Sequence, residues 1–130
     1  MTKVKKAIQA HGAPAAVGFY SQAIETAGLV FCSGQIALDS ATGKLVEGGI
    51  EHETRRLMAN LRAVLNEAGL GFDDVVKTTI FLLALKDFEV VNGIYGEHFD
   101  PPYPARSTVQ VAALPRGARV EIEAIAIRKA

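Results

Sequence analysis

The feature that most constrains the fold is a change of period in the middle of the chain. Over residues 50–68 the apolar side chains recur at spacings of three, four and seven, which is one face of an α-helix. Gly69 follows, at a position where glycine commonly ends a helix. A helix with one apolar face must bury that face against a second layer, so the flanking segments are expected to supply a sheet. The apolar positions are Ile50, Leu57, Leu61, Val64, Leu65 and Ala68.

The segments on either side of this helix have the patterns of strands. Before it, residues 4–10, 22–26 and 29–35 are predicted strands, and the Ala27-Gly28 turn between the last two indicates a hairpin. After it, residues 75–83 are β-branched and apolar on both faces, which predicts a central, buried strand. Two further strands are expected at residues 106–111 and 118–128.

A second helix is expected after Asp87, which is a suitable N-cap, and the prolines of DPPYP at residues 100–104 would end it. Its inner face would carry Val91, Ile94, Tyr95 and His98. The resulting order, β-β-β-α-β-α-β-β, predicts a single α+β domain over residues 1–130, with a mixed six-stranded sheet and two helices on one face. The other face then needs a partner, and a second or third subunit is the simplest one.

Composition argues against some classes of partner, and a net charge near zero, with little repulsion between molecules, favours an oligomer. The 14 basic and 14 acidic residues give a formal net charge of zero, which argues against binding to nucleic acid or to a membrane surface. The basic N-terminus has no apolar run behind it, and no stretch approaches the length of a membrane span. Cys32 is the only cysteine, which excludes an intramolecular disulfide and fits a reducing cytoplasm.

Two segments near the C-terminus carry charged groups suited to chemistry. Arg106 follows the proline-stiffened PPYPA and begins a strand, where a planar guanidinium can bind a carboxylate in bidentate fashion. Strand alternation places Glu121 and Glu123 on the same face as two isoleucines, so one acid could orient a water molecule. The structural alternatives are a surface arginine at a strand end and two acids at a solvated strand end.

The N-terminal third offers two weaker candidates. Tyr20 lies in a glycine-bounded loop, where an aromatic ring can close over a ligand, and Gly34 lies in a strand, where glycine often marks close backbone approach. Ordinary packing for Tyr20 and a β-bulge for Gly34 are the structural alternatives. Cys32 has the pattern of a small buried hydrophobe, and His11, His52 and His98 lack metal-ligand spacing. Neither a phosphate-binding loop nor a serine nucleophile motif is present.

Several of these segments resemble one known family along nearly the whole chain. The matching stretches are APAAVGFYSQAI, VFCSGQIALDSATGKLV, VVKTTIFL, YPARSTVQVAALPRGA and VEIEAIAIRK. They are similar to the RidA family of enamine/imine deaminases, also called the YjgF or L-PSP endoribonuclease family. The resemblance implies a chorismate-mutase-like fold and a homotrimer with active sites between subunits. It also implies hydrolysis of imines such as 2-iminopropanoate to a 2-oxo acid and ammonia, without cofactor or metal.

The resemblance also assigns roles to individual residues. The family's carboxylate-binding arginine falls on Arg106, and its water-positioning glutamate falls on Glu121. The tyrosine over the ligand falls on Tyr20, the glycine that approaches the substrate falls on Gly34, and a recurrent asparagine near the site falls on Asn92.

Two departures from the family pattern bear on the substrate. Phe19 stands where many members have proline, and Thr108 stands in the pocket where many have cysteine. The stretch before Pro104 is also shorter than in some members. Three alternatives therefore stay open: deamination of another substrate such as 2-aminomuconate, binding of a metabolite without turnover, and RNA cleavage. The last is disfavoured because the sequence shows no basic stripe and no histidine pair.

Overall fold

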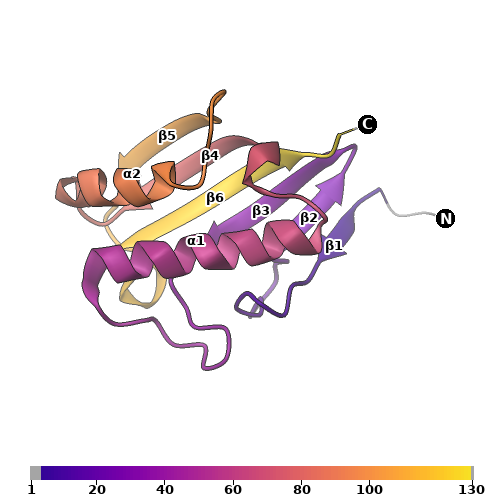
Figure 1. Ribbon diagram of the computed structural model, residues 1–130. Coiled ribbons are helices and arrows are strands. Elements are labelled where there is room, and N and C mark those ends of the chain that lie inside the picture. Colours follow the sequence, from indigo (N-terminus) through magenta and orange to yellow (C-terminus); the bar gives the residue numbers. More distant parts are fainter. Residues whose placement is uncertain (1–3, 130) are drawn as a thin grey trace.

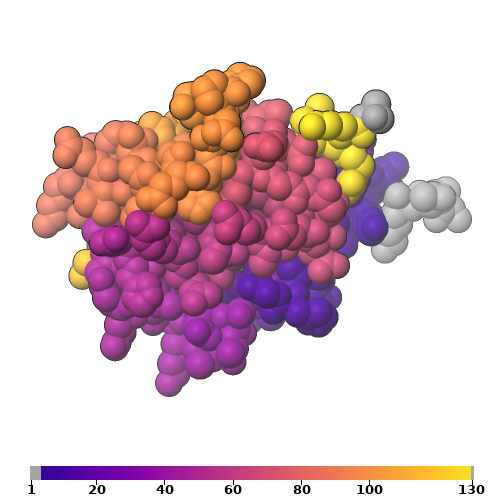
Figure 2. Space-filling model, viewed as in Figure 1, coloured from indigo at the N-terminus to yellow at the C-terminus, as the bar shows by residue number. Residues whose placement is uncertain are grey.

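The computed structural model describes residues 4–129 and has two layers, a six-stranded sheet and two helices (Figure 1). Helix α1 (Gly49–Glu67) and helix α2 (Phe88–Gly96) both lie against one face of the sheet, as predicted. In the same view, the helices and the segments joining them cover this face of the molecule (Figure 2). The α+β class and the predicted order of elements are confirmed.

The sheet is mixed, and its last strand lies near its middle. The strands in chain order are β1 (Lys6–Ile8), β2 (Ala23–Thr26), β3 (Leu29–Gln35), β4 (Val75–Leu82), β5 (Ala105–Gln110) and β6 (Val120–Ile127). Their spatial order is β1-β2-β3-β6-β4-β5. All neighbours are antiparallel except β4 and β5, which are parallel because α2 lies between them in the chain. Strand β5 is therefore an edge strand.

Helix α1 supplies one side of the core and ends as its sequence predicts. Gly69 has a φ of +76°, and its N–H donates to Asn66 O at 2.9 Å while Leu70 N–H donates to Leu65 O at 2.9 Å. This pair of bonds is the Schellman motif, which needs a left-handed residue and so favours glycine. The largest side chains that are fully buried come from α1 and from the facing strands, among them Leu57, Met58, Leu61, Leu65, Ile80, Leu82 and Ile122.

Within residues 4–129, no helix or strand covers the second face of the sheet. Along β6, Val120, Ile122, Ala124 and Ala126 are buried under the helices, while Glu121, Glu123, Ile125 and Ile127 face the open side, as the alternation predicts. Strand β4 is central, because it pairs on both sides, but only one of its faces is buried. The prediction of burial on both faces is wrong for the single chain. We call the uncovered side the open face.

Three predicted details differ from the structure at element ends. The first strand covers Lys6–Ile8 rather than residues 4–10, because only those residues pair with β2. Asp87 precedes α2 but belongs to a short 3-10 turn, and its side chain makes no capping hydrogen bond. His98 lies beyond the end of α2, where its ring packs edge-on against Phe72.

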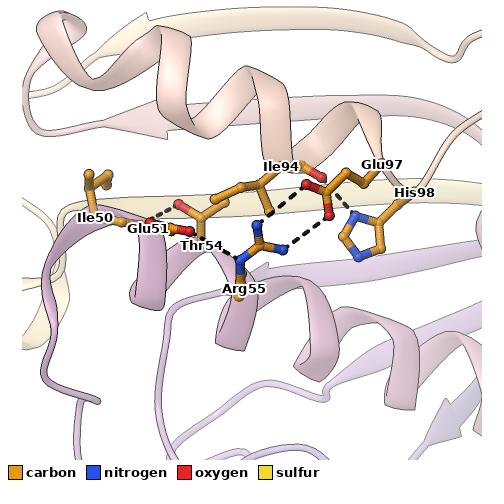
Figure 3. A network of polar contacts seen from close by, with 7 residues as sticks. All are labelled: Ile50, Glu51, Thr54, Arg55, Ile94, Glu97 and His98. Atoms are coloured by element: carbon orange, nitrogen blue, oxygen red, sulfur yellow. Dashed lines mark hydrogen bonds and ion pairs between the residues drawn. The ribbon is translucent and has the colours of Figure 1, made fainter.

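An exposed polar network joins the two helices (Figure 3). Arg55 on α1 donates to Glu97 Oε1 at 3.0 Å and to Glu97 Oε2 at 3.4 Å, and Glu51 Oε1 lies 3.6 Å from Arg55 Nε. The hydrogen bond from Arg55 lowers the pKa of the Glu97 carboxyl below its usual value. The network ties the C-terminal end of α2 to α1. Helix α2 in turn carries Asn92, one of the predicted site residues.

Candidate active site

Glu121 lies on the open face of β6 and packs directly against the backbone of Gly34. A Cβ built on Gly34 would come within 2.8 Å of Glu121 Cδ, closer than real atoms approach. Gly34 sits where the β3–β6 register is irregular, between the pairs Cys32–Ala124 and Gln35–Ile122. The predicted close approach and the predicted bulge are therefore both present, and the bulge makes room for the carboxylate.

The surroundings of Glu121 suit it to hold a proton. Burial removes water from its carboxyl group and raises its pKa above the usual value, and the negative charge of Glu123 on the same face adds to the effect. A carboxylate with a raised pKa is a better base in the neutral pH range. Glu121 is thus the acid of β6 that is suited to act as a base.

Glu121 and Gly34 line a cavity of about 520 Å³ together with Tyr20. Ser33 and Arg116 lie on its wall. Tyr20 is 55 % exposed and stands in the loop before β2, so it lines the cavity from the surface rather than from the core. The structure therefore brings together three of the predicted site residues, which come from two strands and one loop.

Arg106 is held at a different place, on the edge strand β5 beside α2. Its Nη1 donates to Asn92 Oδ1 at 2.7 Å, and its guanidinium lies 5.0 Å from the ring centroid of Tyr95 and 5.5 Å from that of Phe88. Tyr95 is itself fixed by a 2.8 Å hydrogen bond between its hydroxyl and Thr78 Oγ1. An arginine stacked on two rings keeps free donors in a defined orientation, which suits a planar anion such as a carboxylate.

The remaining residues near Arg106 complete a second cavity. It has a volume of about 520 Å³, and Tyr103 and Pro104 close it on the side of the segment that leads into β5. Thr108 is half-buried two residues further along β5 and pairs with Ile80, so it faces the same side as Arg106. The predicted group of Arg106, Asn92 and Thr108 is therefore on one side of the sheet.

The two groups of predicted residues do not meet within one chain. Arg106 pairs with Thr78, which is buried under α2, whereas Glu121 pairs with Phe81 on the open face. Strand spacings place Arg106 roughly 10 Å from Glu121 across the sheet and roughly 10 Å along it. The acidic face of the last strand therefore supplies no partner for Arg106 of the same chain, and one small substrate cannot touch both residues.

Sequence reasoning missed the aromatic support of Arg106. Tyr95 was expected only to line the core, and Phe88 was given no role, yet both rings lie under the guanidinium. The spacing of Asn92 and Tyr95, three residues apart on one helix face, was the available signal. Arg116, on the wall of the Glu121 cavity, was also missed; it has a left-handed φ of +59° and donates to Gly43 O at 2.9 Å.

Cys32 is buried, as the sequence indicates. Burial raises the pKa of the Cys32 thiol to about 12, so it stays protonated and packs as a small apolar group. Within residues 4–129, no group of three or more His, Cys, Asp or Glu side chains is arranged to hold a metal ion. Over the same residues, neither helix combines the length and apolar character needed to span a membrane.

The fold and the site define a class of small two-layer α+β proteins, with a carboxylate against a glycine on the open face and an arginine held on the edge strand. Residues 10–128 match the family model described as Endoribonuclease L-PSP. The chain therefore belongs to the L-PSP family, which includes the RidA proteins.

Similar proteins cover almost the whole chain. The 2-iminobutanoate/2-iminopropanoate deaminase of Mus musculus is 48% identical, with 96% of this chain and 93% of the relative covered. The human protein of the same name is 44% identical, with 96% and 91% covered. Among solved structures, RidA from a Psychrobacter species has a TM-score of 0.89 at 43% identity, covering 94% of this chain and 98% of its own. Escherichia coli TdcF with bound serine has a TM-score of 0.88 at 39% identity, covering 95% and 99%.

Proposed function

We propose that the chain is a 2-iminobutanoate/2-iminopropanoate deaminase, which hydrolyses small imino acids to 2-oxo acids and ammonia. Relatives 44 to 48% identical over nearly their full length carry this name. The observation that carries the proposal is the Glu121 carboxylate, which has a raised pKa and lies against Gly34 in a cavity. The cavity of about 520 Å³ beside this carboxylate is large enough for a water molecule and a small imino acid.

In the proposed reaction Glu121 acts as general base and then as general acid. It takes a proton from water while the water oxygen bonds to the imine carbon and the C=N π electrons move to nitrogen. It then gives this proton to the amine nitrogen of the resulting carbinolamine. As the C–N bond breaks and ammonia leaves, the oxygen lone pair forms the C=O bond and Glu121 accepts the hydroxyl proton, which it later releases to ammonia or solvent. Such proton transfer is worth about a hundred- to ten-thousand-fold in rate. The step needs no nucleophilic side chain and no redox partner.

Arg106 would bind the substrate carboxylate and so fix the imine carbon relative to the water. The Asn92 hydrogen bond and the stacked rings of Tyr95 and Phe88 restrict its guanidinium before substrate arrives. A preoriented clamp lowers the entropic cost of reaching the reactive geometry. Thr108, on the same face of β5, would contact the substrate beside the carboxylate, and Tyr20 would cover it.

We infer further that the protein is a homotrimer with its sites between subunits. Arg106 and Glu121 of one chain lie on opposite sides of the sheet, so each site would combine Arg106 of one subunit with Glu121 of another. The open face supports association, since Phe31 is 41 % and Val109 is 42 % exposed there. The number of subunits, three, comes from the family resemblance. The cytoplasmic location stays a prediction.

The direct test measures 2-oxo acid release from an imine generated in situ from threonine or serine by a pyridoxal-phosphate dehydratase. We expect the purified protein to accelerate release, and Arg106→Ala to abolish the acceleration while leaving the circular dichroism spectrum unchanged. Lys77→Ala serves as a matched control, because it removes a cation from the neighbouring strand. Full acceleration by Arg106→Ala would contradict the proposal.

A further inference from the structure

A buried carboxylate outside the proposed site makes contacts at the start of the strand that carries Glu121. Glu53 lies on α1 and is only 4% exposed. Its Oε1 accepts the backbone N–H of Arg119 at 3.0 Å, and its Oε2 lies 3.7 Å from Arg119 Nε. A carboxylate is costly to bury unless its oxygens are hydrogen-bonded. Both contacts of Glu53 go to one residue, which stands two positions before Glu121.

The backbone bond is the more important of the two contacts. The Arg119 side chain is 53% exposed, so water and salt screen its attraction to Glu53. The Arg119 N–H, by contrast, has a partly buried bond to Glu53, and the Arg119 carbonyl accepts Leu83 N–H at 3.0 Å. The backbone around Arg119 is thus fixed from α1 on one side and from the end of β4 on the other.

The first residues of β6 depend on this anchor because the sheet holds them on one side only. Toward β4, Val120 pairs with Leu82 and Glu121 with Phe81. Toward β3, the pairing ends at Gln35 with Ile122, beyond the irregularity at Gly34. Glu121 thus lies past the last regular β3 pair, beside the bulge that makes room for its carboxylate. Glu53 supplies the hydrogen bond from the helical layer that this end of the strand needs.

We propose that Glu53 is a positioning residue that holds the start of β6 and thereby fixes the Glu121 carboxylate against Gly34. The inference deepens the proposed deaminase function and rests on it. Glu53 touches neither substrate nor water in this account. Its contribution is the acceptor oxygen and not the charge, so an amide oxygen at the same place is expected to serve equally well.

Three variants separate these roles. Glu53→Ala removes the acceptor, Glu53→Asp withdraws it by one methylene, and Glu53→Gln retains an oxygen that can accept the Arg119 N–H. In steady-state assays of 2-oxo acid release, we expect kcat to fall about tenfold in the Ala and Asp variants, a fraction of the general-base contribution. KM should stay within about twofold, because carboxylate binding by Arg106 is untouched. The Gln variant should keep the parent kcat. If Glu53→Ala does not fold, the comparison of Glu53→Asp with Glu53→Gln tests the same point.

A double variant distinguishes positioning from a general structural role. In a Glu121→Gln background, adding Glu53→Asp should lower kcat no further, because the base it positions is already gone. Three outcomes would each overturn the proposal. They are a further tenfold loss of kcat in the double variant, an unchanged kcat in Glu53→Asp alone, and a loss of kcat in Glu53→Gln equal to that in Glu53→Asp.

A second readout does not depend on activity. In an NMR titration of the Glu121 carboxyl carbon, Glu53→Asp should move the pKa back toward the ordinary value as the carboxylate reaches solvent, while Glu53→Gln should leave it raised. Identical titrations in all variants would overturn the role of Glu53. A parent protein without deaminase activity but with the expected titration shifts would overturn the proposed function alone.

Discussion

Replacement of Gly34 by alanine isolates the contact on which the proposed chemistry depends. The φ of Gly34 is outside the left-handed region, so alanine fits the backbone without strain. Its Cβ would lie 2.8 Å from Glu121 Cδ, whereas ordinary contacts begin at 3.4 Å. The carboxyl group must therefore move by at least about 0.6 Å, and by more at its nearer oxygen. A misplacement of about 1 Å can cost about a hundredfold in rate.

We expect Gly34→Ala to lower kcat for 2-oxo acid release by about a hundredfold while changing the free energy of unfolding by less than about 1 kcal/mol, since the end of a flexible side chain moves and the backbone does not. Gly71→Ala is the matched control: a Cβ there meets no atom within 4 Å, and its φ of −139° suits alanine. Urea unfolding checks stability and steady-state kinetics check kcat. A folded Gly34→Ala protein with full kcat would refute the reasoning.

Three further predictions follow from the site. Activity should rise as pH rises through the raised pKa of Glu121, because the base must be ionised. Glu123→Gln should move this acid limb of the pH–rate profile to lower pH, because it removes a negative charge that raises the pKa of Glu121. An unmoved acid limb would show that Glu123 does not raise the pKa of Glu121. Asn92→Ala should raise KM about tenfold and leave the acid limb of the pH–rate profile in place, because only the orientation of Arg106 is lost. An unchanged KM in kinetic assays would contradict the role of Asn92 in orienting Arg106. Iodoacetamide should leave activity intact, because the thiol of Cys32 is buried and protonated; inactivation together with labelling of Cys32 on mass spectrometry would contradict it.

Local patterns predicted the elements of the fold well because each has a local physical cause. The period over residues 50–68 and Gly69 located α1 to within a residue at each end, and the alternation along β6 assigned all eight of its side chains to the correct faces. The first strand was predicted too long, since its length depends on pairing with β2 rather than on composition.

The site was predicted residue by residue, but its assembly was not accessible to intrachain patterns. Nothing local in the sequence indicates that β6 lies between β3 and β4, and that order decides how far Arg106 is from Glu121. Nor does the sequence show that the two residues face opposite sides of the sheet, because this depends on the register between β4 and its neighbours. Only the family resemblance suggested a site between subunits.

The most direct test of the account mixes two inactive proteins. Arg106→Ala and Glu121→Ala subunits, each with its own affinity tag, are co-expressed and the doubly tagged oligomers are assayed for 2-oxo acid release. If each site takes Arg106 from one subunit and Glu121 from another, every doubly tagged trimer contains one intact site among its three seams, which is about a third of the sites of the parent. The account predicts roughly that fraction of the parent activity. Mixed oligomers as inactive as either variant alone would contradict a site shared between subunits.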